Sequence, residues 1–228
     1  MRKLEITFIL IISFTIFSCE KKDSNLEIEK EIINNLFVEM VDSVHKDPRI
    51  YLTFPPFPDI IYDEKGNQIG VDSTEYKTEI IKYNHKEELR KKDTSKLVIG
   101  VSEKIYKPSK YEYETIRSYF KTLKLQIDTT DNPIENRIDI ENFKNNNKFR
   151  FKYLSEFPEG ANILNNDGTF KFSGGIAFSK IIFDERKQIG ILCGNYLCKP
   201  RCGIGYLIII EKINNKWKIK KIEQTWQS

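Results

Sequence analysis

Three cysteines lie within ten residues near the C-terminal end of the chain, and their spacing allows three kinds of chemistry. The segment reads Cys-Gly-Asn-Tyr-Leu-Cys-Lys-Pro-Arg-Cys, and its thiols belong to Cys193, Cys198 and Cys202. They could form a disulfide, hold a zinc ion or act as a redox pair. If a hairpin turns at Pro200, Cys198 and Cys202 face each other across it. We therefore favour a Cys198–Cys202 disulfide, with Cys193 as a buried free thiol.

The zinc and redox alternatives each lack a group that they would need. A closed zinc site takes four ligands, and no histidine or acid follows the third cysteine within the loop. A reactive thiol pair is typically a Cys-x-x-Cys motif followed by a helix N-terminus, and the spacing here is different. Both alternatives remain beside the structural disulfide, and the pairing among the three cysteines stays open. We expect no metal site and no cofactor.

The fourth cysteine, Cys19, follows a segment typical of a secretory signal. Residues 2 and 3 are basic, and nine of the twelve residues 6–17 are apolar, a run too short to span a bilayer. The run ends Ile-Phe-Ser-Cys at residues 16–19, which looks like a bacterial lipobox, where the cysteine is acylated and becomes the mature N-terminus. The alternative is an ordinary signal peptide with an incidental cysteine.

The lipobox divides the chain into three parts. We expect residues 1–18 to be a lipoprotein signal peptide, residues 19–25 a polar tether, and residues 26–228 a single α+β domain with a possible seam at the polar stretch 128–147. Two or three acyl chains anchor a protein stably without a spanning helix. Glu20, in place of Asp, resembles lipoproteins sent to the outer membrane of Gram-negative bacteria, so we expect that membrane, with the periplasmic or surface face left open.

The sequence offers no recognised catalytic set. It contains neither Gly-x-Ser-x-Gly nor His-Glu-x-x-His, and both histidines, His45 and His85, lie among charged residues, so we expect them to be exposed. Glu156 and Glu159 flank a Phe-Pro pair, but a glycosidase pair is defined by a distance across a cleft. No catalytic residue is therefore assigned.

The acidic stretch after residue 127 does not have the pattern of a calcium-binding loop. An EF-hand needs oxygen ligands at fixed positions and glycine at the sixth, and a loop that begins at Asp128 has Pro133 there. We therefore interpret this stretch as a solvated loop; its acids are Asp128, Asp131, Glu135 and Asp139.

Charge and composition exclude two classes of protein. The chain has 37 Lys and Arg against 33 Asp and Glu. Removal of residues 1–18 takes away two bases and one acid, which leaves 35 bases, 32 acids and a net charge of +3. So small an excess of positive charge does not indicate a nucleic-acid-binding protein. With 39% hydrophobic residues, the chain is not of the disordered class.

Apolar periodicity predicts which elements hold these residues in place. It indicates amphipathic helices at about 26–46, 75–92 and 111–125, with Ile80, Ile81 and Leu89 as the inner face of the second. It predicts a hairpin at 59–71 and a buried strand at 96–102, and after residue 147 strands at 149–153, 174–184, 188–197, 204–213 and 216–226.

The strand at 204–213 is apolar on both faces, so it must be central and covered on both sides. We expect an α+β fold in which the N-terminal helix and further helices pack on a C-terminal antiparallel sheet of four to five strands.

Residues 54–58 form a segment rich in proline and phenylalanine, Phe-Pro-Pro-Phe-Pro. Such a segment is neither helix nor central strand. We interpret it as a rigid connection that Phe54 and Phe57 pin to the core; the alternative is an exposed ligand for a partner.

Several short motifs lie within the last 50 residues. They are Ser179 to Asp184, Cys198-x-x-x-Cys202-Gly203-x-Gly205, Glu211-Lys212, Trp217-Lys218 and Trp226-x-Ser228. This stretch resembles a group of uncharacterised bacterial lipoproteins and secreted proteins. The resemblance implies a Ser-led strand, a hairpin with a Cys pair and a closing strand with Trp, and it carries no known activity.

A lipid anchor without a catalytic set predicts a membrane-anchored envelope lipoprotein. We expect a non-enzymatic binding or interaction module, immunity-type proteins that block a toxin included. Its partners would be the membrane, through the lipid on Cys19, and an envelope protein or toxin, but no nucleic acid. The alternative is a small envelope hydrolase with convergent carboxylates. A deep pocket with perturbed carboxylates would favour the hydrolase, and an exposed apolar patch would favour the binding module.

Overall fold

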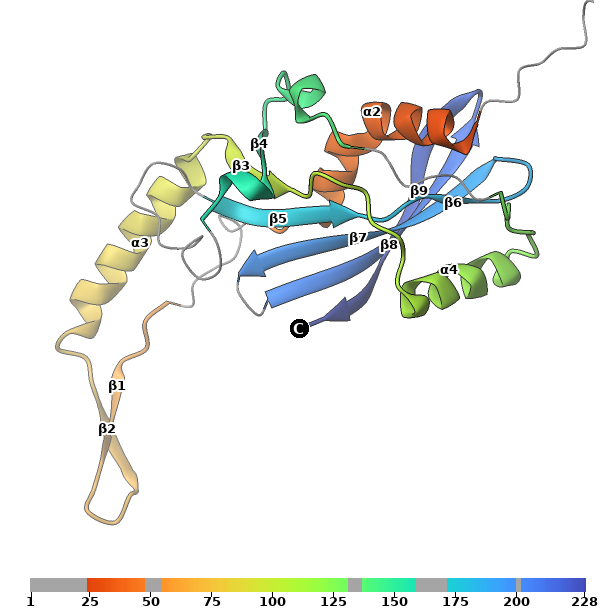
Figure 1. The fold of residues 1–228 in the computed structure, drawn as a ribbon. Helices are drawn as coiled ribbons and strands as arrows, with labels where there is room; N and C mark the ends of the chain where they lie inside the picture. The colour runs from red at the N-terminus through yellow and green to blue at the C-terminus, as the bar shows by residue number, and fades with distance from the viewer. Residues whose placement is uncertain (1–23, 48–54, 131–136, 159–171, 200–201) are drawn as a thin grey trace, which may run out of the picture.

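A large sheet with one helix on each face forms the body of the protein (Figure 1). The computed structural model describes residues 24–47, 55–130, 137–158, 172–199 and 202–228. Its helices are α2 (Asn25–Val44), α3 (Tyr76–Lys92) and α4 (Lys110–Thr122), with short 3-10 turns η1 (Ile140–Phe143) and η2 (Leu154–Glu156). None of the helices in these ranges is both long and apolar enough to cross a membrane.

The main sheet has seven strands in the order β4-β3-β5-β7-β8-β9, with β6 paired to β7. The strands are β3 (Leu97–Val101), β4 (Phe149–Tyr153), β5 (Phe172–Phe178), β6 (Ile182–Phe183), β7 (Ile189–Lys199), β8 (Cys202–Ile213) and β9 (Lys216–Gln227). Strands β1 (Asp59–Tyr62) and β2 (Gln68–Asp72) form a separate hairpin.

The predicted α+β class is confirmed, but the predicted antiparallel sheet of four to five strands is wrong, because the sheet is larger and mixed. Strand β3 lies between β4 and β5 and runs parallel to both. Parallel neighbours need a long crossover, and the chain between β3 and β4, which includes α4, supplies it. The predicted strand at 174–184 is also divided, because it leaves the ladder at Ser179 to Ile181 and returns as β6.

Strand β8 is central and covered on both faces, as its sequence predicts. Ile204, Tyr206, Ile208 and Ile210 join the core beneath α2, whereas Leu207 and Ile209 pack with Ile116 and Phe120 of α4. Burial of one face against each helix removes a large apolar area from water and is the main stabilising contribution to such a domain.

Local sequence explains how α2 begins and how it packs. The Ser24 hydroxyl accepts the N–H of Glu27, and the Glu27 carboxylate accepts the N–H of Ser24, which is a capping box. The apolar stripe of the helix then lies in the core, with Phe37, Met40 and Val41 fully buried. The predicted N-terminal amphipathic helix is confirmed.

The hairpin β1–β2 and α3 also form where the sequence predicts them, but they project away from the sheet (Figure 1). The predicted inner face of α3 is wrong, because Ile81 is 68% exposed and Leu89 58% exposed. The interpretation of residues 54–58 as pinned to the core is wrong for Phe57, which is 75% exposed; Phe54 lies outside the described residues.

Candidate functional site

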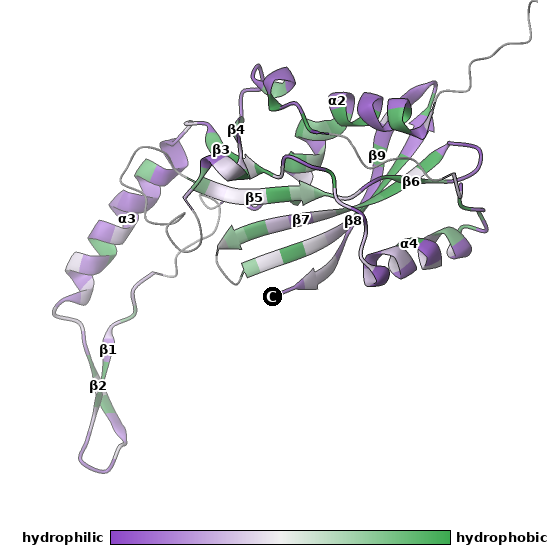
Figure 2. Ribbon diagram, viewed as in Figure 1, coloured by the Kyte–Doolittle hydropathy of each residue, from purple (hydrophilic) through white to green (hydrophobic). Residues whose placement is uncertain are grey.

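The most unusual surface of the molecule is the projecting segment 55–92, which we call the arm. Most of its large apolar side chains are exposed; they are Phe57, Ile60, Ile61, Tyr62, Ile69, Val71, Ile81 and Leu89. Figure 2 shows these apolar positions interspersed with polar ones along the hairpin and α3. Single exposed apolar residues need no explanation, but a group on one protruding element is typical of an interaction surface.

The hairpin is held by its turn rather than by a core. The Asp63 carboxylate accepts the N–H groups of Lys65 and Asn67 and the Asn67 side-chain amide. These hydrogen bonds lower the pKa of Asp63, chiefly those from Asn67. Ile60 faces Val71 across the two strands. A two-stranded hairpin alone is only marginally stable in water. Neither outer edge of this sheet pairs with another strand of the described ranges, so both edges can offer backbone groups to an added strand.

Charge is divided between the two parts of the arm. Residues 59–72 contain four acids and one base, a net charge of −3, whereas α3 contains six bases and three acids, a net charge of +3. The arm therefore presents one acidic and one basic surface, which favours a partner with a definite orientation.

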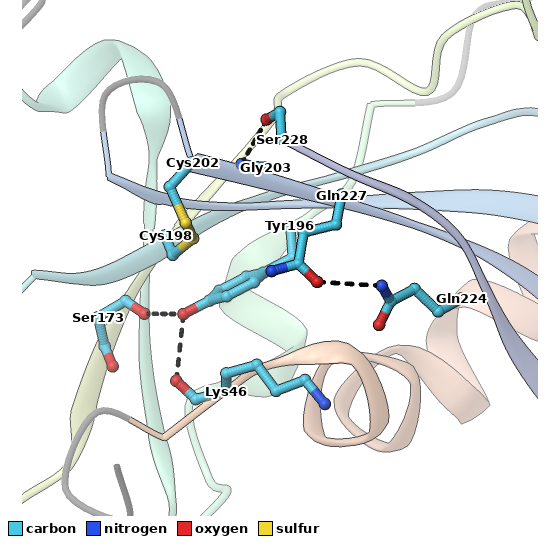
Figure 3. Close-up of a disulfide and its surroundings, with 9 residues drawn as sticks. All are labelled: Lys46, Ser173, Tyr196, Cys198, Cys202, Gly203, Gln224, Gln227 and Ser228. Atoms are coloured by element: carbon cyan, nitrogen blue, oxygen red, sulfur yellow. Dashed lines mark hydrogen bonds between the residues drawn. A yellow bond between two sulfur atoms is a disulfide. The ribbon is translucent and has the colours of Figure 1, made fainter. Parts of the chain in front are cut away.

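The cysteines take the arrangement that the sequence favours. The sulfur atoms of Cys198 and Cys202 lie at disulfide distance, with 5.4 Å between the Cα atoms (Figure 3). Cys193 faces Leu207 across the β7–β8 ladder and is buried. Burial, followed by the charge of Glu112, raises the pKa of Cys193 to about 12. Among the described residues no group of three potential ligands could hold a metal ion.

His45 is buried, which corrects the prediction that it is exposed; His85 is exposed as predicted. The ring of His45 continues the buried stripe of α2, since it lies four residues after Val41. Its Nε2 lies 3.0 Å from the Ser173 hydroxyl and 3.2 Å from the Ser173 carbonyl oxygen. The Val41 spacing is the signal that could have shown burial, but nothing in the sequence points to Ser173.

A serine hydroxyl beside an imidazole resembles the first two members of a hydrolytic triad. Here, however, Nδ1 of His45 is buried without a hydrogen-bond partner among the described residues, where a triad would have its carboxylate. Ser173 is only 5% exposed. The neighbouring Tyr196 hydroxyl donates to the carbonyl groups of Ser173 and Lys46 (Figure 3). The arrangement joins α2, β5 and β7 and is structural.

Those acids considered from the sequence that the structure describes each accept a backbone N–H from a residue nearby in the chain. Glu156 accepts the N–H of Tyr153, and Asp139 accepts the N–H of Glu141. The pKa of Asp128 is lowered overall. Burial alone would raise this pKa, but hydrogen bonds from Thr130 and Asn25 outweigh the effect of burial. Each of these carboxylates ends or caps a local turn. Glu159, Asp131 and Glu135 lie outside the described residues, as does Cys19.

Nothing in the sequence indicated a half-buried polar cluster between α4 and the sheet. The Tyr106 hydroxyl donates to the Glu112 carboxylate at 2.7 Å and accepts from the Asn195 amide at 2.7 Å. Burial tends to raise the pKa of Glu112, but hydrogen bonds from Tyr106 and Ser109 hold it below its ordinary value. An ionised carboxylate that fixes a helix to a sheet has a structural role, not that of a general acid.

Comparison with known protein families, with curated proteins and with solved structures found no match to the chain.

Proposed function

We propose that the protein is a membrane-anchored envelope lipoprotein and a non-enzymatic binding module, in which the arm contacts a protein partner. The observation that carries the proposal is the exposure of apolar side chains on the hairpin and α3, outside a core that is already complete between α2, the sheet and α4. An immunity-type protein that blocks a toxin at the envelope is one form of this function.

The form of the hairpin indicates how the partner would bind. An extended segment can add to the edge of a sheet, where main-chain hydrogen bonds supply affinity and alternate side chains supply specificity. Here an added strand would complete a marginal two-stranded sheet and cover Ile60 or Ile69. Because the hairpin has a net charge of −3, we expect a partner segment with basic residues beside its apolar ones.

The alternative function, a hydrolase with convergent carboxylates, has less support. A general acid needs a pKa raised toward neutrality. The carboxylates with a resolved shift are Asp63, Asp72, Glu112 and Asp128, and the pKa of each is lowered. These four carboxylates are therefore suited to capping and hydrogen bonding rather than to proton donation.

Site-specific photo-crosslinking in cells tests the role of the arm. A photoreactive amino acid replaces Ile69 in the arm or, as a matched control, Lys216, the exposed first residue of β9. We expect a discrete heterologous protein product from position 69 alone. The captured protein is then purified and titrated, and Ile69→Asp should weaken its binding at least tenfold.

Three outcomes would overturn the role of the arm. They are the absence of an arm-specific product, the same product from position 216, and a product with twice the mass of the chain, which would assign the arm to a second copy. The anchor is tested separately by palmitate labelling of the wild-type protein and of Cys19→Ala. We expect label on the wild type alone, and equal labelling would refute acylation at Cys19.

A further inference from the structure

A cleft of about 640 Å³ opens where the first residues of α2 and α4 meet the connection from β5 to β6 and the segment 127–130. Its volume falls within the range of small-molecule sites. Its lining combines apolar side chains, among them Ile127, Ile182 and Phe183, with three lysines. The proposed function uses none of these residues.

The charge around the cleft favours an anion. Lys107, Lys110 and Lys180 line it, against the single carboxylate of Asp128. That carboxylate already accepts hydrogen bonds from the Asn25 amide at 2.9 Å and from the N–H of Thr130 at 2.9 Å. Lys110 is also the first residue of α4, so the positive end of the helix dipole lies at the cleft.

One wall of the cleft is held by a hydrogen bond between α2 and the segment 127–130. Asn25 lines the cleft and is 8% exposed, and its amide nitrogen donates to the Asp128 carboxylate. Its Oδ1 is buried and has no hydrogen-bond partner within the described ranges. Because that atom is not exposed to the cleft, Asn25 shapes the wall, and the lysines are the polar groups that can contact a ligand.

We propose that the cleft binds a phosphoester that combines two features. Its phosphate contacts Lys107 and Lys110, and its apolar part covers Ile182 and Phe183. Lysine is a common phosphate ligand. Anionic phospholipids such as phosphatidylglycerol have this composition.

The position of the cleft along the chain favours a membrane source for the ligand. Asn25 is six residues after Cys19, and six residues span at most about 20 Å. With the anchor described under the proposed function, the cleft would therefore lie close to the lipid headgroups. The chemistry of the cleft itself does not depend on acylation.

Lipid binding by the full-length protein in detergent micelles tests the proposal. Native mass spectrometry measures its binding of phosphatidylglycerol, of phosphatidylcholine and of soluble glycerol 3-phosphate. Phosphatidylcholine carries a quaternary ammonium that offsets its phosphate, so we expect it to bind beside the lysines at least tenfold more weakly than the anionic phosphatidylglycerol. Lys107→Gln combined with Lys110→Gln should weaken phosphatidylglycerol binding at least tenfold. The matched control, Lys121→Gln with Lys216→Gln, removes two exposed lysines elsewhere and should stay within twofold of wild type.

Each outcome decides the question. Glycerol 3-phosphate that binds as tightly as the lipid would support the site and assign it to a soluble phosphoester. Equal binding of the two lipids, an unchanged Lys107 and Lys110 double variant, or no binding of any of the three probes would overturn the proposal. Because the assay needs no acyl group on Cys19, failure of the anchor in the palmitate experiment is distinguishable from failure of the cleft.

Discussion

The imidazole Nε2 of His45 lies 3.0 Å from the hydroxyl oxygen of Ser173, although 128 residues separate the two along the chain. The contact fixes the C-terminal end of α2 to the beginning of strand β5. Both residues are more than nine-tenths buried. A positive charge on the His45 ring would therefore have to be accommodated away from water, which is unfavourable.

Acid should weaken the fold through His45. Burial is the main cause that lowers the pKa of His45, and a hydrogen bond with Ser173 and the charge of Asp47 oppose it only in part. In the unfolded chain His45 is protonated near pH 6.5, whereas in the folded protein its protonation requires a lower pH. The contribution to stability is complete above pH 6.5 and is lost as the pH falls below that value.

Urea unfolding at pH 7.5 and pH 5.5 measures this effect. We expect the free energy of unfolding of the wild type to fall over that interval, and His45→Gln to reduce the fall. His85→Gln is the matched control, because His85 is exposed, and it should behave as the wild type. An identical slope in His45→Gln would show that the ring does not titrate on unfolding.

Cys193 should be almost inert in the folded protein. With a pKa raised to about 12 by burial, its thiolate fraction at pH 8 is about one ten-thousandth, against about a quarter for an ordinary thiol. Iodoacetamide should therefore modify Cys193 at least a hundredfold more slowly in native buffer than in urea, as followed by mass spectrometry. Cys193→Ala identifies the signal. Labelling at similar rates in both conditions would contradict a buried, structural thiol.

The Cys198–Cys202 pair should contribute modestly to stability. The two residues are four positions apart, and closure of so short a loop is worth about 2 kcal/mol on the chain-entropy estimate. Reductant should lower the free energy of unfolding of the wild type by about this amount. Cys198→Ser with Cys202→Ser should no longer respond to reductant, whereas Cys193→Ala should respond as the wild type does. A double variant that remains sensitive to reductant would place the bridge elsewhere.

The register of the C-terminal hairpin β7–β8 could be predicted from local sequence alone. A turn between Cys198 and Cys202 sets the register of β7 against β8, and that register places Cys193 opposite Leu207. The two apolar faces of β8 required cover on both sides, and α2 and α4 provide it. These predictions succeeded because each depends on neighbours within about 20 residues.

The features that sequence missed depend on distant partners. Nothing within β3 shows that it will lie between β4 and β5, since pairing across such separations is set by the whole sheet. The burial of His45 depends on Ser173. Likewise, the periodicity of α3 shows an apolar stripe at Ile81 and Leu89 but not whether its cover lies within the same chain. The surface of the arm was therefore beyond prediction, although its helix and hairpin were not.

The close approach of Trp226 to Gly205 provides the sharpest test of packing in the sheet. The two residues pair across β8 and β9, and the indole lies where a side chain on Gly205 would begin; a Cβ there would overlap the indole ring nitrogen. The same indole also lies over Gly203, where an added Cβ would meet it at 3.0 Å, so the ring packs against two glycines of β8. Overpacking of this kind typically costs about 1–3 kcal/mol, and we expect Gly205→Ala to lower the free energy of unfolding by that amount.

A glycine in the exposed hairpin supplies the matched control for this substitution. A Cβ on Gly70 would meet only the Ile61 side chain, at an ordinary 3.9 Å, so Gly70→Ala should change stability by less than about 0.5 kcal/mol. Urea unfolding compares the two variants, and a Gly205→Ala, Trp226→Ala double variant tests the cause, because the two losses should not add when the second substitution removes the overlap. Equal effects of Gly70→Ala and Gly205→Ala, or strictly additive losses in the double variant, would show that Trp226 does not require glycine at position 205.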